Sequence, residues 1–132
     1  MPKKLLIIED NANILCALQA KFRIEGFEVL TENGSNPAEE IISLTNKEKP
    51  DYIVLDLILP KVDGFSLLAD LKADAQLAKI PVFIFTNLSD EDSRQRGASF
   101  GAEQYLIKSE LNIDDFVEKI KKIIKNRVTR NT

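Results

Sequence analysis

Five polar side chains of this sequence follow short apolar segments, and their types match those of a site that handles phosphate. They are three carboxylates, a hydroxyl and an ammonium group, carried by Glu9, Asp10, Asp56, Thr86 and Lys108. An acidic residue after an apolar segment often caps the next helix, so each position alone carries little information. Gathered in one place, however, carboxylates and a lysine can bind a divalent cation and a phosphoryl group.

The acidic residues predict an electrostatic conflict if the segments that carry them are neighbours. Two carboxylates ~4–5 Å apart repel by about 4 kcal/mol at an effective dielectric constant of 20, which corresponds to roughly three pKa units. Either one carboxyl group is then protonated at neutral pH, or a cation neutralises the site. The chain has no histidine and a single cysteine, so the ligands on offer are oxygens, which favour Mg²⁺, with Mn²⁺ as a second candidate.

The same residues exclude several other chemistries. Without histidine, the chain can form neither a histidine-based catalytic triad nor a histidine-containing zinc site. Residues 9–13, which follow the first apolar segment, have neither the glycines nor the lysine of a nucleotide-binding loop. We therefore expect neither a nucleotide nor a flavin to bind at that loop.

The apolar segments recur with a spacing that is typical of an α/β protein. They are Lys4–Ile8, Glu28–Thr31, Tyr52–Leu55, Val82–Phe85 and Gln104–Ile107. Their first residues are 24, 24, 30 and 22 positions apart, which leaves room for a helix between successive parallel strands. The first, third and fourth segments have consecutive apolar residues, as central strands do, whereas the second is mixed and suits an edge. Functional residues of such sheets collect at the carboxyl ends of the strands.

Apolar residues at helical spacing fill the first two intervals. The stripe of the first expected helix consists of Ile14, Ala17, Leu18 and Phe22. Cys16 lies beside this stripe, and we expect a small packed thiol there, not a reactive one. Pro37 suits the first turn of a second helix, with Ser35 or Asn36 as its cap.

The other three intervals differ in how strongly they predict a helix. The turn Asp63-Gly64 precedes a third helix, and Asn112 caps a very regular fifth one. Lysines near the end of the fifth helix complement its macrodipole, which we favour over a basic partner surface. The fourth interval offers apolar surface only at Ala98 and Phe100, so we expect a weakly held helix, as in many switching segments.

Composition bounds the domain organisation. The 132 residues are 44% hydrophobic and 30% charged, so we expect one domain over residues 1–132 with a core over about 4–126. A net charge of −3 argues against direct binding to nucleic acid. Since no apolar run is long enough for a signal peptide or membrane insertion, and one cysteine cannot form a disulfide within the chain, we expect a cytoplasmic location.

The order and spacing of these pieces resemble the receiver domain of two-component response regulators, especially the small single-domain chemotaxis type. The similarity covers residues 4 to about 126. Its motifs are Glu9-Asp10, Leu55–Pro60 followed by Asp63-Gly64, Phe85-Thr86 and Gly101–Lys108. The resemblance implies an α/β fold, the flavodoxin-like (βα)5 three-layer sandwich, with a five-stranded parallel sheet of order 2-1-3-4-5.

The resemblance also implies a role for each site residue. Asp56 is expected to be the nucleophile that accepts a phosphoryl group and becomes an acyl phosphate. Asp10 and Asp56 are expected to bind Mg²⁺ directly, Glu9 directly or through water, and Ile58 through its backbone carbonyl. Lys108 is expected to pair with the phosphoryl oxygens, where metal and lysine neutralise the charge of the transition state.

The implied output is a conformational switch. The Thr86 hydroxyl is expected to move toward the phosphoryl group, and Tyr105 to turn inward as Thr86 moves. A tyrosine on an edge strand can also simply cover the core with its ring. Signalling is expected through the fourth helix, fifth strand and fifth helix. The implied partners are a histidine kinase or phosphotransfer protein, an unknown downstream protein, and a second copy of the chain in a phosphorylation-dependent homodimer.

Two residues depart from the pattern of the family, and two others stand at positions that set its rate of dephosphorylation. Asn87 stands where the family usually has a small residue beside the site. Ser109 replaces the proline after Lys108, so the cis bend that the family usually has there cannot be assumed, and the sequence leaves the isomer of this bond open. Apolar residues stand where the family tunes dephosphorylation, at Ile58 and Leu88. Since neither can orient an attacking water, we expect a long-lived acyl phosphate.

Two alternative functions remain open at this point. One is a receiver-like adaptor that binds its partner without phosphorylation, which the departures at Asn87 and Ser109 would suit. The other is an aspartyl-phosphate phosphatase of the haloacid-dehalogenase type. That family places a second aspartate two residues after the nucleophile, where this chain has Ile58. We therefore expect a signalling domain and not an enzyme.

Overall fold

The computed structural model describes residues 3–131, in which strands and helices alternate along the chain. The strands are β1 (Lys4–Ile8), β2 (Glu28–Glu32), β3 (Tyr52–Leu55), β4 (Val82–Thr86) and β5 (Gln104–Ile107). The helices are α1 (Ala12–Ile24), α2 (Ala38–Glu48), α3 (Gly64–Ala73), α4 (Glu91–Ser99) and α5 (Ile113–Asn131), with a short 3-10 helix η1 (Lys108–Glu110).

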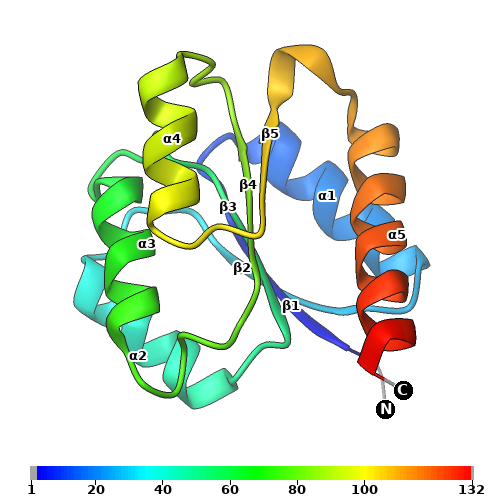
Figure 1. The fold of residues 1–132 in the computed structure, drawn as a ribbon, viewed down its shortest axis with the longest axis horizontal. Helices are drawn as coiled ribbons and strands as arrows, with labels where there is room; N and C mark the ends of the chain where they lie inside the picture. Colours follow the sequence, from blue (N-terminus) through cyan, green and yellow to red (C-terminus); the bar gives the residue numbers. More distant parts are fainter. Residues whose placement is uncertain (1–2, 132) are drawn as a thin grey trace.

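All strand pairs of the sheet are parallel, and the strand order is β2-β1-β3-β4-β5. This confirms the predicted fold class and strand order, including the edge position of β2. Helices α1 and α5 cover one face of the sheet, and α2, α3 and α4 cover the other (Figure 1). The sheet is therefore the middle layer of a three-layer sandwich.

Alternation of side chains along the strands divides the core between the two faces. In β1, Leu5 and Ile7 pack in the cluster with α1 and α5, whereas Leu6 and Ile8 pack in the cluster with α2 and α3. All four side chains are fully buried. Burial on both faces explains why the central strands are apolar at consecutive positions.

Side-chain caps fix the starts of most helices. Asn11, Asp63, Asp90 and Asn112 each accept a hydrogen bond from a backbone N–H in the first turn of α1, α3, α4 and α5. The predicted cap at Asn112 is therefore confirmed. Each cap fixes where the loop ends and the helix begins, and so helps to position the residues between strand and helix.

The predicted cap of α2 is wrong. The helix begins at Ala38, and its N-cap position is Pro37, which makes no side-chain cap. The Ser35 hydroxyl instead donates to Oδ1 of Asn33, 2.5 Å away, and the Asn36 side-chain amide donates to Glu32, 3.2 Å away. The side chains expected to cap the helix take part in hydrogen bonds within the loop that precedes it.

The expectation that Cys16 is a packed thiol is wrong, and the residue is exposed. The buried residues of α1 are Leu18 and Phe22. Cys16 lies two positions before Leu18, about 200° away around a helix of 3.6 residues per turn. Its side chain therefore lies on the outer side of α1. Among the helices of residues 3–131, none combines the length and the apolar character needed to cross a bilayer.

Candidate functional site

The predicted site residues lie together at the carboxyl edge of the sheet. Glu9 and Asp10 follow β1, and Asp56 follows β3, the neighbour of β1. Thr86 is the last residue of β4, and Lys108 directly follows β5. Parallel strands of similar length bring these positions to one edge, as the sequence predicted.

Three carboxylates form the centre of this site. Ligand oxygens of Glu9, Asp10 and Asp56 all lie within 4.8 Å of one another. Glu9 and Asp56 are 2% and 4% exposed, whereas Asp10 is exposed. Two of the three carboxylates are therefore largely removed from water, where their mutual repulsion is strong unless a cation compensates for it.

The ammonium group of Lys108 supplies a cation between the two buried carboxylates. Its Nζ lies 2.6 Å from Oε1 of Glu9 and 2.7 Å from Oδ2 of Asp56, and only 10% of its side chain is exposed. The sequence left open whether protonation or a cation relieves the repulsion. In the structure an ammonium group from the far end of the chain pairs with both carboxylates.

Burial and pairing perturb the titration of two of these groups. Burial raises the pKa of Glu9, although hydrogen bonds from Lys108 and from the backbone N–H of Asn11 oppose this. Burial lowers the pKa of Lys108, but its hydrogen bonds to Asp56 and Glu9 outweigh that effect, and the pKa is raised overall. Lys108 therefore remains an ammonium ion at neutral pH.

Backbone hydrogen bonds hold the acidic residues in register with the sheet. The N–H of Glu9 donates to the carbonyl of Glu32 at 3.0 Å, and that of Asp56 donates to the carbonyl of Ile8 at 3.0 Å. The Asp56 carboxylate accepts from the N–H of Ile58 at 3.1 Å. Both carboxylates thus stand on the sheet itself, which limits their freedom to separate.

The loop after Asp56 is closed by a glycine. Gly64 donates from its N–H to the carbonyl of Leu57 at 3.2 Å, and a Cβ on Gly64 would lie only 2.3 Å from the Leu57 Cα. An isolated antiparallel bridge joins Ile58 to Asp63 within the same loop. Only glycine fits at position 64, because any side chain would collide with backbone.

Thr86 and Tyr105 are linked through the loop that follows β4. Thr86 is fully buried, and its hydroxyl oxygen lies 3.5 Å from the N–H of Leu88. The Tyr105 hydroxyl donates to the carbonyl of Leu88 at 2.7 Å, and burial raises the pKa of Tyr105. In this structure Tyr105 is thus anchored to the β4–α4 loop. The neighbouring Asn87 is exposed.

The donor set suits a small divalent cation. Glu9, Asp10 and Asp56 offer carboxylate oxygens within the range of one ion, and no histidine or cysteine stands among them. Hard oxygen ligands of this kind favour Mg²⁺ or Mn²⁺. Ile58 follows two residues after Asp56, is 51% exposed, and belongs to the same loop. The triad can therefore bind a divalent metal.

Two contacts at this site were not predicted from the sequence. The pairing of Lys108 with Glu9 joins residues that follow β5 and β1, two strands that are separated in the sheet by β3 and β4. The acceptor for Tyr105 is a backbone carbonyl. A backbone acceptor leaves no trace in residue types, so no sequence signal could have identified Leu88. The sequence left open the isomer of the Lys108-Ser109 peptide bond, and residues 3–131 contain no cis peptide bond.

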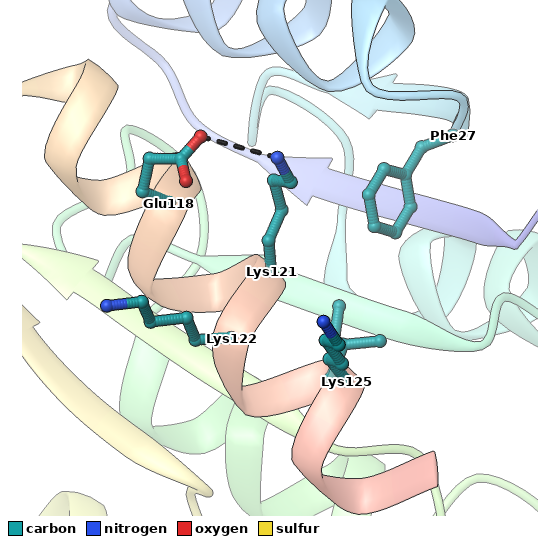
Figure 2. A pocket seen from close by; sticks show the side chains of 6 residues that line it. Phe27, Glu118, Lys121, Lys122 and Lys125 are labelled. Atoms are coloured by element: carbon teal, nitrogen blue, oxygen red, sulfur yellow. Dashed lines mark hydrogen bonds and ion pairs between the residues drawn. The ribbon is translucent and has the colours of Figure 1, made fainter. Parts of the chain in front are cut away.

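A hollow elsewhere on the molecule has a different character. It has a volume of about 390 Å³ and is lined by Phe27, Glu118, Lys121, Lys122, Ile124 and Lys125. Figure 2 shows Lys121 pointing toward Glu118, with which it forms an ion pair. Phe27 directly precedes β2, so this hollow lies at the amino edge of the sheet and includes no residue of the acidic site.

Comparison with protein families and curated proteins gives a consistent match. The family model of the response regulator receiver domain matches residues 5–121 of this chain. A probable transcriptional regulator ycf27 of Porphyridium aerugineum is 33% identical over 106 residues, which are 80% of this chain and 42% of that protein. The alkaline phosphatase synthesis transcriptional regulatory protein PhoP of Bacillus subtilis is 33% identical over 108 residues, 82% of this chain and 43% of that protein. The chain spans less than half the length of these relatives.

Solved structures agree with this match. The Mn(2+)-bound form of response regulator Rcp1 is 27% identical, with a TM-score of 0.75 over 89% of this chain and 88% of that one. The BeF3-activated DrrB receiver domain is 26% identical, with a TM-score of 0.78 over 95% of this chain and 99% of that one. The similarity to these structures thus extends over nearly the whole chain.

Proposed function

Because this chain belongs to the response regulator receiver domain family, we propose that it is a phospho-acceptor switch in two-component signal transduction. Asp56 accepts the phosphoryl group in this proposal, from a histidine kinase or a phosphotransfer protein. The observation that carries it is the position of Lys108 Nζ, 2.7 Å from Asp56 and 2.6 Å from Glu9, in a cluster whose third carboxylate is Asp10. A receiver domain is a signalling domain, so the alternative of a haloacid-dehalogenase-type phosphatase is set aside.

The proposed reaction is a transfer of phosphorus from nitrogen to oxygen. A carboxylate oxygen of Asp56 attacks the phosphorus of a phosphorylated histidine on the donor protein. The new O–P bond forms while the N–P bond breaks, and the electron pair of that bond leaves with the donor imidazole. Lys108 turns its ammonium group from the free carboxylate to the phosphoryl oxygens, where it stabilises the charge of the transition state.

The acidic residues hold the metal in this proposal. Asp10 and Asp56 bind it directly, Glu9 binds directly or through water, and Ile58 contributes its backbone carbonyl. Bound Mg²⁺ would neutralise charge on the phosphoryl oxygens as transfer proceeds. The Mn(2+)-bound form of Rcp1, a 27% identical relative of the same fold, supports this assignment.

The output side of the proposal starts at Thr86. Its hydroxyl moves toward the new phosphoryl group and carries the β4–α4 loop with it. Tyr105 follows, because its hydroxyl is bonded to the carbonyl of Leu88 in that loop at 2.7 Å. Phosphorylation then shifts the equilibrium between two packings of α4, β5 and α5. A hollow of about 280 Å³ on this face, lined in part by Tyr105 and Leu111, would meet a downstream protein or a second copy of the chain.

Domain organisation and location belong to the same proposal. The receiver domain model matches residues 5–121, and we propose that this domain has its core over about residues 4–126, is located in the cytoplasm and does not itself contact nucleic acid. The curated relatives named above are transcriptional regulators of more than twice the matched length. Transcriptional regulation is a property of those longer proteins, and it is not part of this proposal.

Acetyl phosphate tests the proposal without knowledge of the kinase. Incubation with acetyl phosphate and Mg²⁺ should add the mass of one phosphoryl group to the intact protein. Asp56→Asn should abolish this gain, while Asp70→Asn, at an exposed position on α3, should leave it unchanged. If the chain without substitutions gains no mass and shows no change in its amide resonances, the phospho-acceptor function is wrong. An adaptor that binds its partner without phosphorylation then replaces this proposal.

A further inference from the structure

Helix α4 has almost no apolar anchor of its own. Its buried residues are Ser93 and Gly97, which bury little apolar surface. Gly97 makes room for the Tyr105 ring, since a Cβ there would lie 2.7 Å from a ring carbon. A helix without large buried side chains depends on other contacts to fix its position against the sheet.

One such contact is a stack of Arg96 on two aromatic rings. The guanidinium carbon of Arg96 lies 4.0 Å from the centroid of the Phe65 ring and 5.9 Å from that of Phe100. The two rings meet edge to face at 6.3 Å. The planar guanidinium of Arg96 on α4 thus lies over the ring of Phe65 on α3, and Phe65 itself is only 5% exposed. Such stacking is favourable for arginine in particular.

The Phe65 end of this stack is fixed to the acidic site. Asp63 accepts a hydrogen bond from the Phe65 N–H at 3.2 Å. Gly64, the residue between them, donates to the carbonyl of Leu57 at 3.2 Å, and Leu57 directly follows Asp56. The first turn of α3 therefore has little freedom to move without the backbone that carries Asp56.

We propose that the stack of Arg96 on Phe65 couples the occupancy of Asp56 to the position of α4. This contact acts in parallel with the route through Thr86 and Tyr105, and the inference rests on the proposed function. The stack is formed in a structure where Lys108 pairs directly with Asp56, a pairing that a phosphoryl group would replace. In this proposal the stack stabilises the arrangement in which Lys108 pairs with Asp56 and opposes the phosphorylated one.

Coupling between two sites is reciprocal. If occupancy of Asp56 affects the stack, the stack must affect the affinity of the Asp56 site for a phosphoryl analogue by the same free energy. Breaking a contact that stabilises the unphosphorylated arrangement favours the other arrangement. An exposed cation–π contact corresponds to a factor of about two to five in an equilibrium constant. The apparent affinity for a phosphoryl analogue should rise by that factor when the stack is removed.

The test uses beryllofluoride with Mg²⁺ as the phosphoryl analogue, titrated into the whole chain and followed by amide resonances of α4. Arg96→Gln and Phe65→Leu should each raise the apparent affinity two- to fivefold. The double variant should gain no more than either single variant, because both changes remove one contact. Arg23→Gln removes the same charge from an exposed position of α1 and should leave the affinity unchanged.

The outcomes separate this coupling from the proposed function. If the parent chain binds beryllofluoride but Arg96→Gln does not tighten binding, or if the effects of the two substitutions add, the coupling is overturned and the proposed function stands. If the parent chain does not bind, the proposed function fails and the coupling fails with it. Arg96→Gln alters an exposed side chain, so it decides the question even if Phe65→Leu does not fold.

Discussion

The ammonium nitrogen of Lys108 lies 2.6 Å from the Oε1 atom of Glu9, so the residue after the last strand holds the residue after the first. The same nitrogen also pairs with Asp56. A metal ion at the acidic triad would need these carboxylates too. Lys108 and the metal therefore compete for the same negative charge before phosphoryl transfer, and cooperate in stabilising the phosphoryl oxygens during it.

Removing Lys108 should expose this competition. Without Mg²⁺, Lys108→Met should lower the free energy of unfolding by about 3 kcal/mol, because two buried carboxylates lose their partner. Millimolar Mg²⁺ should then stabilise the variant more than it stabilises the parent chain. Urea unfolding with and without Mg²⁺ measures both effects. Lys79→Met, at an exposed position, serves as the control, and equal stabilisation of variant and parent by Mg²⁺ would contradict the competition.

The triad should bind magnesium before any phosphoryl group arrives. Titration with Mg²⁺ should shift amide resonances of Asp10, Asp56 and Ile58 at millimolar concentrations. Asp10→Asn should weaken binding about tenfold, equivalent to about 1.4 kcal/mol, because it removes one anionic ligand. Shifts that remain the same in Asp10→Asn, or that fall elsewhere in the molecule, would show that the triad is not the metal site.

The acyl phosphate should be long-lived, because the side chains at Ile58 and Leu88 cannot orient a water molecule. Ile58→Asn should speed its hydrolysis by about tenfold, equivalent to about 1.4 kcal/mol in the activation barrier. Loss of label from radiolabelled protein measures the rate. The matched control is Ile24→Asn, since Ile24 is 81% exposed on α1. A parent chain that loses its label as fast as the rapid chemotaxis regulators would refute the prediction.

The closed loop after Asp56 should not tolerate a side chain at Gly64. Gly64→Ala should lower the free energy of unfolding by about 1–3 kcal/mol, as overpacking usually does, and should also weaken beryllofluoride binding. Gly26 makes a useful contrast, because its φ of +94° strains any other residue while nothing lies within 4 Å of an added Cβ. Gly26→Ala should therefore lower stability without changing beryllofluoride affinity. Unchanged binding in Gly64→Ala would show that loop closure does not position Asp56.

Residue patterns along the chain predict the positions of the site residues well. The apolar segments that end before Glu9, Asp56 and Lys108 are strands in the structure. The segments before Glu9 and Asp56 are recognisable because burial on both faces of the sheet requires consecutive apolar residues, and the segment before Lys108 is recognisable from its spacing along the chain. Parallel strands then bring their carboxyl ends to one edge regardless of the details of packing. The approach of Asp10 to Asp56 follows from the pairing of β1 with β3.

Contacts that depend on side-chain direction are not predictable in this way. The pairing of Lys108 with Glu9 depends on the turn after β5. The stack of Arg96 on Phe65 joins an exposed charged residue of α4 to a buried aromatic residue of α3, and no spacing along the chain pairs these two residues. Cys16 shows the same limit, because a residue beside an apolar stripe can lie on either side of it. Such contacts are set by tertiary packing, which periodicity does not encode.

Mapping the phosphorylated residue decides whether Asp56 is the phospho-acceptor. After incubation with acetyl phosphate, reduction with borohydride converts an aspartyl phosphate to homoserine, and peptide sequencing then locates the modified residue. We expect modification at Asp56 that requires Mg²⁺ and disappears in Asp56→Asn. Modification at another residue, or none in the presence of millimolar Mg²⁺, would contradict it.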